Sequence, residues 1–500
     1  MIISEVNMRK GFDNAKYMSI QSDCIRERIA QFGGKLYLEF GGKLFDDFHA
    51  SRVLPGFEPD SKIRMLAKMK DEAEIIIAIN AEDIEQNKRR GDLGITYDDD
   101  ALRLVDAFRS LGLFVGSIVI TRYAGQRGAD KFRQRLRDLG MKCFLHYSIP
   151  GYPSDISAIV SENGFGKNDY IETERPLVVV TAPGPGSGKM ATCLSQLYHE
   201  NKRGIKAGYA KFETFPVWNL PLKHPVNIAY EAATADLDDV NMIDPFHLDA
   251  YGKTAVNYNR DVEIFPVLRS MMTQILGECP YKSPTDMGVN MAGFCIYDND
   301  AVCEAANMEV LRRYYRAAQD VAMHAAPVAL LHKNEIIIQQ AQVSKDIFPA
   351  IVAAVKKEEE TEKPAGAIVL NNGKVLTGKT SSLLGASAAL LLNALKAIAG
   401  IDDEIQLISP ETIEPVCRLK TEMLGNRNPR LHSDEVLIAL AACSISDPNA
   451  KKAMDAIPAL RGTDAHFSVI ISHVDEKTFK KLGINVSCEP RYEHRTLYHK

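Results

Sequence analysis

The sequence predicts an α/β protein: an N-terminal doubly wound, mostly parallel sheet, a helical and loop-rich middle region, and a smaller C-terminal α/β domain. Short apolar runs alternate with amphipathic helical patterns between about residues 36 and 211, which is typical of strands joined by crossover helices. One of these runs ends in a glycine-rich loop. A second alternation of strand and helix patterns begins at residue 365, so we expect domains at 1–225, 226–364 and 365–500.

Six apolar runs of strand length make up the predicted parallel sheet, and helical patterns separate them. The pattern Asp99–Leu111 carries apolar residues at every third position, and Asp130–Leu139 is also helical. Ligands of such sheets bind beyond the carboxyl ends of the strands. The strands are expected at Lys35–Phe40, Glu74–Ile79, Val115–Thr121, Lys142–Tyr147, Leu177–Ala182 and Lys206–Lys211.

The loop that follows Leu177–Ala182 predicts a phosphate-binding site. The strand breaks into three glycines and a lysine, and a helical pattern then begins at Met190. Glycines let successive amide groups turn inward, the helix start adds partial positive charge, and the lysine reaches the outer oxygens. We expect a P-loop-like strand, loop and helix in which the ligand is held by Gly184, Gly186, Ser187, Gly188, Lys189 and Thr192, with Lys189 also catalytic.

This loop departs from the nucleotide-binding pattern G-x-x-x-x-G-K-[ST] at two positions. Pro183 stands where the first glycine belongs, and Met190 replaces the Ser or Thr that would hold magnesium. Thr192 or Ser187 would have to supply the hydroxyl instead. Anion binding is therefore the stronger expectation, and ATP or GTP with magnesium is a candidate cofactor. A purely structural turn is the alternative.

A second segment, Gly373–Thr380, matches the nucleotide-binding pattern letter for letter, but its context predicts a hairpin. The strand Ala367–Leu370 runs into Asn-Asn-Gly, a strong signal for a tight turn, and Lys374–Thr377 can pair back on it. Thr380 or Ser381 would then cap the helix that continues through Leu395. The imperfect loop is therefore the better candidate for a phosphate site.

Other polar residues follow the predicted strands and are expected at the same edge of the sheet. Arg122 is the best second anion clamp, because a guanidinium fork suits phosphate or carboxylate. Lys43 follows two glycines and is a further candidate, although a simple turn explains that segment better. Asp236 is the first choice for a carboxylate that positions a metal, and a surface acid is the alternative, slightly favoured.

The middle and C-terminal regions carry weaker patterns. Long polar stretches in the middle, such as Asn241–Arg260, are expected to be site-forming loops or the arms of a homo-oligomer. The charged run 356–364 is either a linker or the end of a solvated helix. Helices are expected at Val262–Gly277, Ala301–His324 and Asp346–Lys356, and C-terminal strands at Ala367–Leu370, Glu404–Ile408 and Phe467–Ser472.

Composition narrows the classes of function. The net charge of -5 and the pI near 6.2 argue against nucleic acid as the main partner. The start carries no apolar segment typical of a secretory signal, and Leu383–Gly400 reads as a buried helix and not as a membrane span. Nine cysteines without C-x-x-C indicate reduced thiols, so a cytoplasmic protein is expected. Zinc-site and serine-hydrolase motifs are missing from the sequence.

Three passages resemble a bacterial family of about this length that is known under the heading of a domain of unknown function: Val178–Lys189 with the helix after it, Ala210–Pro216 and Ser283–Gly293. The resemblance covers essentially the whole chain and implies a multidomain α/β protein with a P-loop-like segment. Separately, Ala367–Leu395 resembles the opening hairpin and helix of the cytidine-deaminase-like fold. That family's H-x-E and P-C-x-x-C motifs are missing, so the resemblance implies a deaminase-like topology without zinc ligands.

These observations predict an enzyme that binds a small anionic or phosphorylated ligand. Phosphoryl transfer or nucleotide-dependent activation of an anionic metabolite is the expected reaction, with Lys189, Arg122 and Asp236 as the catalytic residues. One alternative is a Rossmann-like binder of a phosphorylated metabolite or cofactor that hydrolyses nothing. Another is an oligomeric assembly protein without catalysis.

Overall fold

The computed structural model describes residues 9–90 and 94–493, and its contacts divide the chain into two compact units. The sheet unit consists of Gly11–Glu231 and Asp238–Cys303. The C-terminal unit consists mainly of Glu304–Lys500 and includes Ala232–Leu237. The three-part division expected from the sequence stays a prediction.

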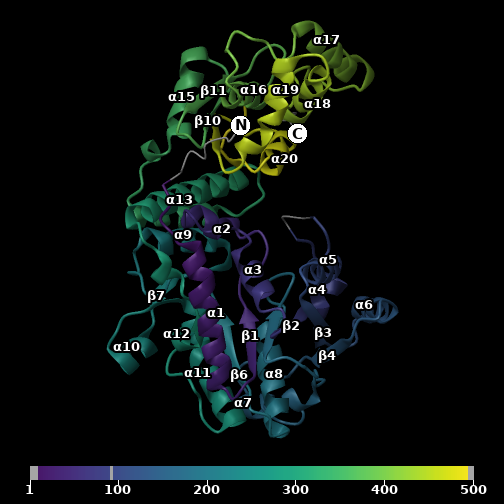
Figure 1. Cartoon of the computed structure of the whole chain (residues 1–500), viewed down its shortest axis with the longest axis vertical. Coiled ribbons are helices and arrows are strands. Elements are labelled where there is room, and N and C mark those ends of the chain that lie inside the picture. The colour runs from purple at the N-terminus through teal and green to yellow at the C-terminus, as the bar shows by residue number, and fades with distance from the viewer. Residues whose placement is uncertain (1–8, 91–93, 494–500) are drawn as a thin grey trace. The chain divides into compact units, whose positions relative to one another are not determined.

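The sheet unit is built on a seven-stranded, wholly parallel sheet in the order β4-β3-β2-β5-β1-β6-β9 (Figure 1). All six predicted strands are confirmed to within two residues. The seventh is a two-residue edge strand in a polar segment that carries no strand pattern. The strands are β1 (Leu36–Phe40), β2 (Ala73–Asn80), β3 (Phe114–Tyr123), β4 (Cys143–Tyr147), β5 (Leu177–Thr181), β6 (Gly208–Phe212) and β9 (Gly288–Val289).

Helices cover both faces of this sheet, as the doubly wound prediction requires. The chain leaves β1 toward β2 and leaves β5 toward β6, so the connections of these two adjacent strands run in opposite directions. Because parallel crossovers are right-handed, the two connections lie on opposite faces. One face carries α8 (Lys189–Lys202) and α11 (Asn259–Leu276), and the other carries α1 (Asn14–Gln31) and α3 (Ser61–Lys68). The carboxyl ends of the adjacent strands β1 and β5 therefore form the topological switch point of the sheet.

The predicted helices Asp99–Leu111, Asp130–Leu139 and Val262–Gly277 are confirmed as α5, α6 and α11. Short elements fill the polar stretch 241–260, including a two-stranded antiparallel ribbon of β7 (Asn241–Ile243) and β8 (Val256–Tyr258). The remaining helices in or bordering the sheet unit are α2 (Phe48–Val53), α4 (Ala81–Glu85), α5 (Tyr97–Ser110), α6 (Arg127–Asp138), α7 (Ile156–Ile159), η1 (Phe165–Lys167), α9 (Pro225–Ala233), α10 (Pro245–Tyr251), α12 (Pro284–Met287), η3 (Ala292–Cys295) and α13 (Asn299–Ala322).

The C-terminal unit contains a smaller mixed sheet in the order β11-β10-β12-β13. Its strands are β10 (Ala365–Val369), β11 (Val375–Lys379), β12 (Asp464–Phe467) and β13 (Asn485–Cys488). The predicted hairpin over 367–377 is confirmed, because β10 and β11 pair antiparallel around the Asn-Asn-Gly turn. The exact nucleotide-binding spelling at Gly373–Thr380 therefore lies on a hairpin strand and not on a phosphate loop.

Three sequence expectations for this unit are wrong. Glu404–Ile408 forms no strand, because Leu407 and Ile408 pack into the helical core without pairing. The strand expected at Phe467–Ser472 ends at Phe467, since the chain turns there toward a new helix. Neither Thr380 nor Ser381 caps the long helix, which begins at Ala386 after a turn; the hydroxyl of Ser381 accepts amide hydrogen bonds within that turn.

The helices Ala301–His324 and Asp346–Lys356 are confirmed as α13 and α15, and the charged run 356–364 is mainly the end of α15 and not a linker. The elements of the C-terminal unit that follow α13 or precede it are η2 (Ala235–Leu237), α14 (Val328–Ala341), η4 (Lys345–Ile347), α15 (Pro349–Thr361), α16 (Ala386–Ala399), α17 (Pro410–Arg418), η5 (Leu419–Met423), α18 (Ser433–Cys443), α19 (Pro448–Asp455), η6 (Ile457–Leu460) and α20 (His473–Lys481).

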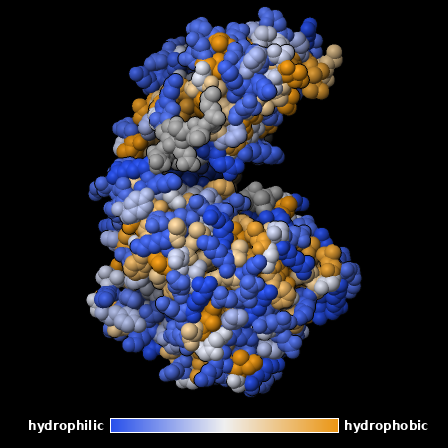
Figure 2. All heavy atoms as spheres, viewed as in Figure 1, coloured by the Kyte–Doolittle hydropathy of each residue, from blue (hydrophilic) through white to orange (hydrophobic). Residues whose placement is uncertain are grey.

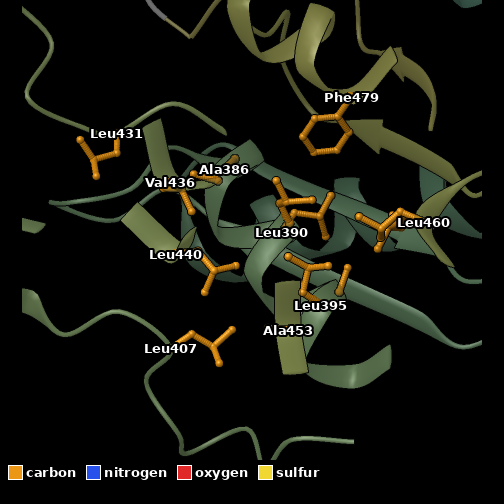
Figure 3. Close-up of a cluster of buried hydrophobic side chains, with 14 of the residues drawn as sticks. Ala386, Leu390, Leu395, Leu407, Leu431, Val436, Leu440, Ala453, Leu460 and Phe479 are labelled. Carbon is orange, nitrogen blue, oxygen red and sulfur yellow. The ribbon is translucent and has the colours of Figure 1, made fainter. Parts of the chain in front are cut away.

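Helix α16 is the centre of the C-terminal core (Figure 3). Leu390 and Leu395 are fully buried among Leu440, Leu460 and Phe479, which confirms that the apolar stretch 383–400 is a core helix. None of the helices in the described ranges is long and apolar enough to cross a membrane. On the face drawn in Figure 2, hydrophilic residues predominate and hydrophobic ones occur in small groups.

Substitution of two glycines of the hairpin would show how closely α16 packs on β11. A Cβ at Gly378 would overlap the backbone of Leu390 on α16, whereas a Cβ at Gly373 would meet open space. We expect Gly378→Ala to destabilise the unit by about 2–3 kcal/mol through overpacking. The matched control is Gly373→Ala. Its only strain comes from the left-handed backbone at this position, φ +79°, so it should lower the free energy of unfolding by about 1 kcal/mol. Urea denaturation followed by circular dichroism measures both; equal losses would contradict the packing.

Candidate functional site

The loop between β5 and α8 presents a row of backbone amides at the switch point of the sheet. Gly186 and Gly188 adopt left-handed conformations, with φ +72° and +83°. Gly188 is the N-cap of α8 and has no side chain to accept from the first turn. Within residues 9–90 and 94–493, the amides of Gly186, Ser187, Gly188 and Lys189 donate to no protein acceptor. Such a start to a helix is an anion-binding geometry.

Neighbouring strands hold the loop through its carbonyl oxygens, which keeps the amides available. The hydroxyl of Thr121 on β3 donates to the Ser187 carbonyl at 2.7 Å, and the amide of Asn80 on β2 donates to the Gly186 carbonyl at 3.5 Å. Gly184 lies against Tyr97, whose hydroxyl oxygen would be 2.5 Å from an added Cβ. The predicted loop residues are therefore held in one conformation by three elements of the sheet unit.

The two hydroxyls that could replace the missing magnesium ligand are both buried. Ser187 is 3% exposed and Thr192 is fully buried, and neither hydroxyl has a hydrogen-bond partner in the described chain. A buried hydroxyl without a partner costs about 1–3 kcal/mol. Ser187 belongs to the loop itself, so a ligand at the amides would be next to it. Thr192 lies one turn into α8, where its own backbone amide bonds to Gly188.

The structure brings some of the predicted charged residues to one edge of the sheet. Lys189 begins α8, is half-buried, and forms no ion pair with any described residue. Arg122 lies near the end of β3 with a left-handed backbone, φ +51°, and its side chain is exposed. Lys43 follows β1, the strand next to β5. Asp236 lies in η2 and belongs to the C-terminal unit, so its role beside Lys189 stays a prediction.

Sequence reasoning missed a buried charged cluster on the strand that neighbours β1 on the other side. Lys211 of β6 contacts the carboxylates of Asp261 and Glu213, the latter at 2.9 Å, and the hydroxyl of Tyr258. On the same face of the sheet, Tyr209 donates to Glu39 of β1 at 2.7 Å. The Lys-Phe-Glu at the end of the predicted strand could have indicated this cluster. Ligands of parallel sheets bind beyond the carboxyl ends of the strands, so charged residues there are candidates for a site.

This cluster has unusual electrostatics for a protein interior. Burial raises the pKa of Glu213 to about 7, because the attraction of Lys211 does not fully offset the loss of water. Burial alone would lower the pKa of Lys211, but Asp261 and Glu213 outweigh it and raise that pKa well above its usual value. Glu213 is therefore a carboxyl group that can gain or lose a proton near neutral pH, at the carboxyl edge of the sheet.

Within the described ranges, no group of three or more His, Cys, Asp or Glu is arranged to hold a metal ion. His146 of β4 is buried and has a structural role. Its ring contacts Gln196 of α8 and the carbonyl of Asp169, and burial lowers its pKa to about 3, so it stays neutral. The candidate site therefore consists of the α8 amides, Lys189 and Arg122, with the Lys211 cluster two strands from the loop.

The titration of Glu213 should appear in the pH dependence of stability. Its pKa is raised on folding, so its stabilising contribution is present below about pH 4.5 and is lost as the pH rises through about 7. In the natural chain this titration should lower the free energy of unfolding by on the order of 1–3 kcal/mol between these pH values. We expect the decrease to be absent from Glu213→Gln. Urea denaturation at a series of pH values measures it. The exposed Glu278→Gln is the control, and an unchanged pH slope in Glu213→Gln would refute the assignment.

Comparison with known proteins places the whole chain in one family. The N-terminal domain of unknown function DUF1846 matches residues 10–342, and the C-terminal DUF1846 domain matches residues 346–498. A UPF0371 protein of Streptococcus thermophilus is 56% identical over 492 residues, which is 98% of this chain and 100% of the relative. UPF0371 proteins of Streptococcus pneumoniae are 55–56% identical over the same lengths. The chain therefore belongs to the DUF1846, or UPF0371, family of bacterial proteins.

Proposed function

We propose that the sheet unit binds the phosphate group of a small anionic metabolite or nucleotide at the start of α8. The proposal rests on one observation: at the topological switch point, amides of the loop and of the α8 start donate to no acceptor in the part of the chain that the structure describes. Several other helix starts in the unit are capped by a side chain of the chain itself. The carboxylate of Asp244, for example, accepts from two amides at the start of α10.

We further propose that the reaction is phosphoryl transfer or nucleotide-dependent activation of the metabolite. The amides of Ser187 and Gly188 and the ammonium of Lys189 would hold the phosphate and stabilise the charge that develops during transfer. Arg122 would clamp the second anionic group, because its exposed guanidinium can form paired hydrogen bonds with a phosphate or a carboxylate. Lys43 would add positive charge after β1. Glu213, with its pKa near 7, would supply the proton acceptor.

A second candidate function is a binder that holds a phosphorylated ligand without transferring the phosphate. Met190 in place of a Ser or Thr favours it, because the usual magnesium-holding hydroxyl is missing. The full burial of Thr192 favours it too. Phosphate affinity without nucleotide turnover would identify this function.

For the C-terminal unit we propose kinship of fold with the cytidine deaminases, without their reaction. Strand β10 lies between β11 and β12 and runs antiparallel to both, while β12 and β13 are parallel. This order supports the expected hairpin-first topology. The zinc-binding motifs are missing from the sequence. A cytoplasmic location and a homo-oligomer stay predictions; nine free cysteine thiols support the location.

The phosphate site is tested by Lys189→Ala. A ligand present at about 100 times its Kd stabilises a protein by about 2.7 kcal/mol, so phosphorylated ligands should raise the melting temperature of the natural chain by several degrees. We expect this shift with at least one of ATP, GTP or a panel of sugar phosphates, and expect Lys189→Ala to remove it. Differential scanning fluorimetry measures the shift.

The matched control is Lys202→Ala, a lysine at the other end of the same helix whose side chain is 53% exposed. It should keep the full ligand-induced shift. Equal shifts in Lys189→Ala and the natural chain, or no shift with any phosphorylated compound, would overturn the proposal. Release of inorganic phosphate or transfer of label from ATP then separates the enzyme from the binder.

A further inference from the structure

The end of β3 contacts the start of α8 directly. The Thr121 hydroxyl donates to the Ser187 carbonyl, and its oxygen would lie 3.1 Å from a Cβ added at Gly188, the N-cap of α8. The hydroxyl of Ser187 is buried there and has no hydrogen-bond partner among residues 9–90 and 94–493. Thr121 is therefore next to the amides of the phosphate loop, and Arg122 and Tyr123 complete β3 at the same carboxyl edge, where ligands of parallel sheets bind.

A pair of tyrosine rings lies at this edge. Tyr123, the last residue of β3, pairs in register with Tyr147, the last residue of β4. Their ring centroids are 6.0 Å apart and the ring planes meet at 68°, which is an edge-to-face arrangement. The two rings therefore do not cover each other face to face, and at least one of them keeps both faces clear of its partner. Both side chains are partly exposed.

Neighbouring side chains fix the two rings, and two cations lie beside them. The hydroxyl of Tyr123 donates to Asp130 of α6 at 2.6 Å, which sets the direction of this ring. The ammonium of Lys167, at the end of η1, lies 4.8 Å from the centroid of the Tyr147 ring. Arg122 precedes Tyr123 and is exposed. An aromatic surface with cations beside it suits a ligand that has both a flat ring and negative charge.

The backbone directly before the pair is irregular. The pairing of β3 with β4 shifts its register between Ile120 and Tyr123, and Arg122 between them has φ +51°, a left-handed conformation that is uncommon outside glycine. An irregularity of this kind changes the direction of the side chains that follow it, and such irregularities are frequent beside ligand sites. The irregularity therefore lies between the phosphate loop and the tyrosine rings.

We propose that the ligand of the sheet unit is a nucleotide, whose phosphate binds at the α8 start and whose base stacks on the Tyr123–Tyr147 pair. This inference rests on the proposed phosphate site. The pair begins on the strand that contacts the phosphate loop and extends one strand further, a spacing of about 4.8 Å. A nucleotide has the same order, with the ribose between phosphate and base. A sugar phosphate has no flat aromatic ring, so the pair favours nucleotides over sugar phosphates.

The experiment compares ribose 5-phosphate with AMP, GMP and UMP. The four compounds share the ribose and its phosphate, and only the nucleotides carry a base. Isothermal titration calorimetry on the full chain measures each Kd. Because bases stack favourably on aromatic side chains, we expect at least one of the three nucleotides to bind about ten-fold more tightly than ribose 5-phosphate.

Variants assign the difference to the two rings. Tyr123→Leu and Tyr147→Leu each remove an aromatic face and keep apolar bulk, so they should reduce the preference for the nucleotide and leave the Kd of ribose 5-phosphate unchanged. Tyr147→Phe keeps the ring and should keep the preference. The matched control is Tyr297→Leu, at a tyrosine of the sheet unit that is 63% exposed. Circular dichroism identifies a variant that fails to fold, in which case the other tyrosine variant carries the test.

Failure of this inference is distinguishable from failure of the phosphate site. If the nucleotides and ribose 5-phosphate bind equally tightly, and Lys189→Ala abolishes the binding of all four, the phosphate site stands and the nucleotide assignment is overturned. A nucleotide preference that stays undiminished in folded Tyr123→Leu and Tyr147→Leu overturns the stacking on these rings. If none of the four compounds binds the natural chain, the phosphate site and the inference are both contradicted.

Discussion

The parallel pairing of β5 with β1 is the constraint on which the sheet unit depends. Residues 177–180 of β5 pair with residues 36–39 of β1, so the two carboxyl ends stop at one edge of the sheet. Their connections leave in opposite directions, one toward β2 and one toward β6. Right-handed crossovers then force the helices onto opposite faces. The space above this edge is left to loops, and the glycine-rich loop stands there with amides that donate to no acceptor among residues 9–90 and 94–493.

Glu213 and Asp475 are both buried carboxyl groups, but their pKa values are shifted in opposite directions. Glu213 is surrounded by other charged groups, and the loss of water raises its pKa toward neutrality. Asp475 is equally enclosed, but four hydrogen-bond donors keep it ionised. The difference lies in the count and geometry of donors, because a carboxylate that receives directed hydrogen bonds needs no water. One carboxyl group is therefore suited to exchange a proton and the other to orient the neighbouring ring of His432.

The two segments that resemble a nucleotide-binding motif differ in the elements that surround them. Gly373–Thr380 has the full spelling, but its glycines serve a tight turn and a close contact between strand and helix. The loop at Gly184–Lys189 matches the pattern less well, but Gly186 and Gly188 take left-handed conformations directly before an uncapped helix. Backbone amides bind anions only when the chain presents them together, and this depends on the elements on either side.

The sequence by itself determined the α/β class, six of the seven parallel strands, the hairpin of the C-terminal unit and the place of the glycine-rich loop. These follow from local patterns: apolar runs, helical periodicity and turn residues. Only the tertiary structure decided that β5 lies between β2 and β1, that Lys211 meets Asp261 across 50 residues, and that His432 meets Asp475 across 43 residues. Burial and long-range pairing depend on how elements pack, so no local pattern contains them. The same reason explains why the strand predicted at Glu404–Ile408 does not form: its apolar residues pack into a helical core instead.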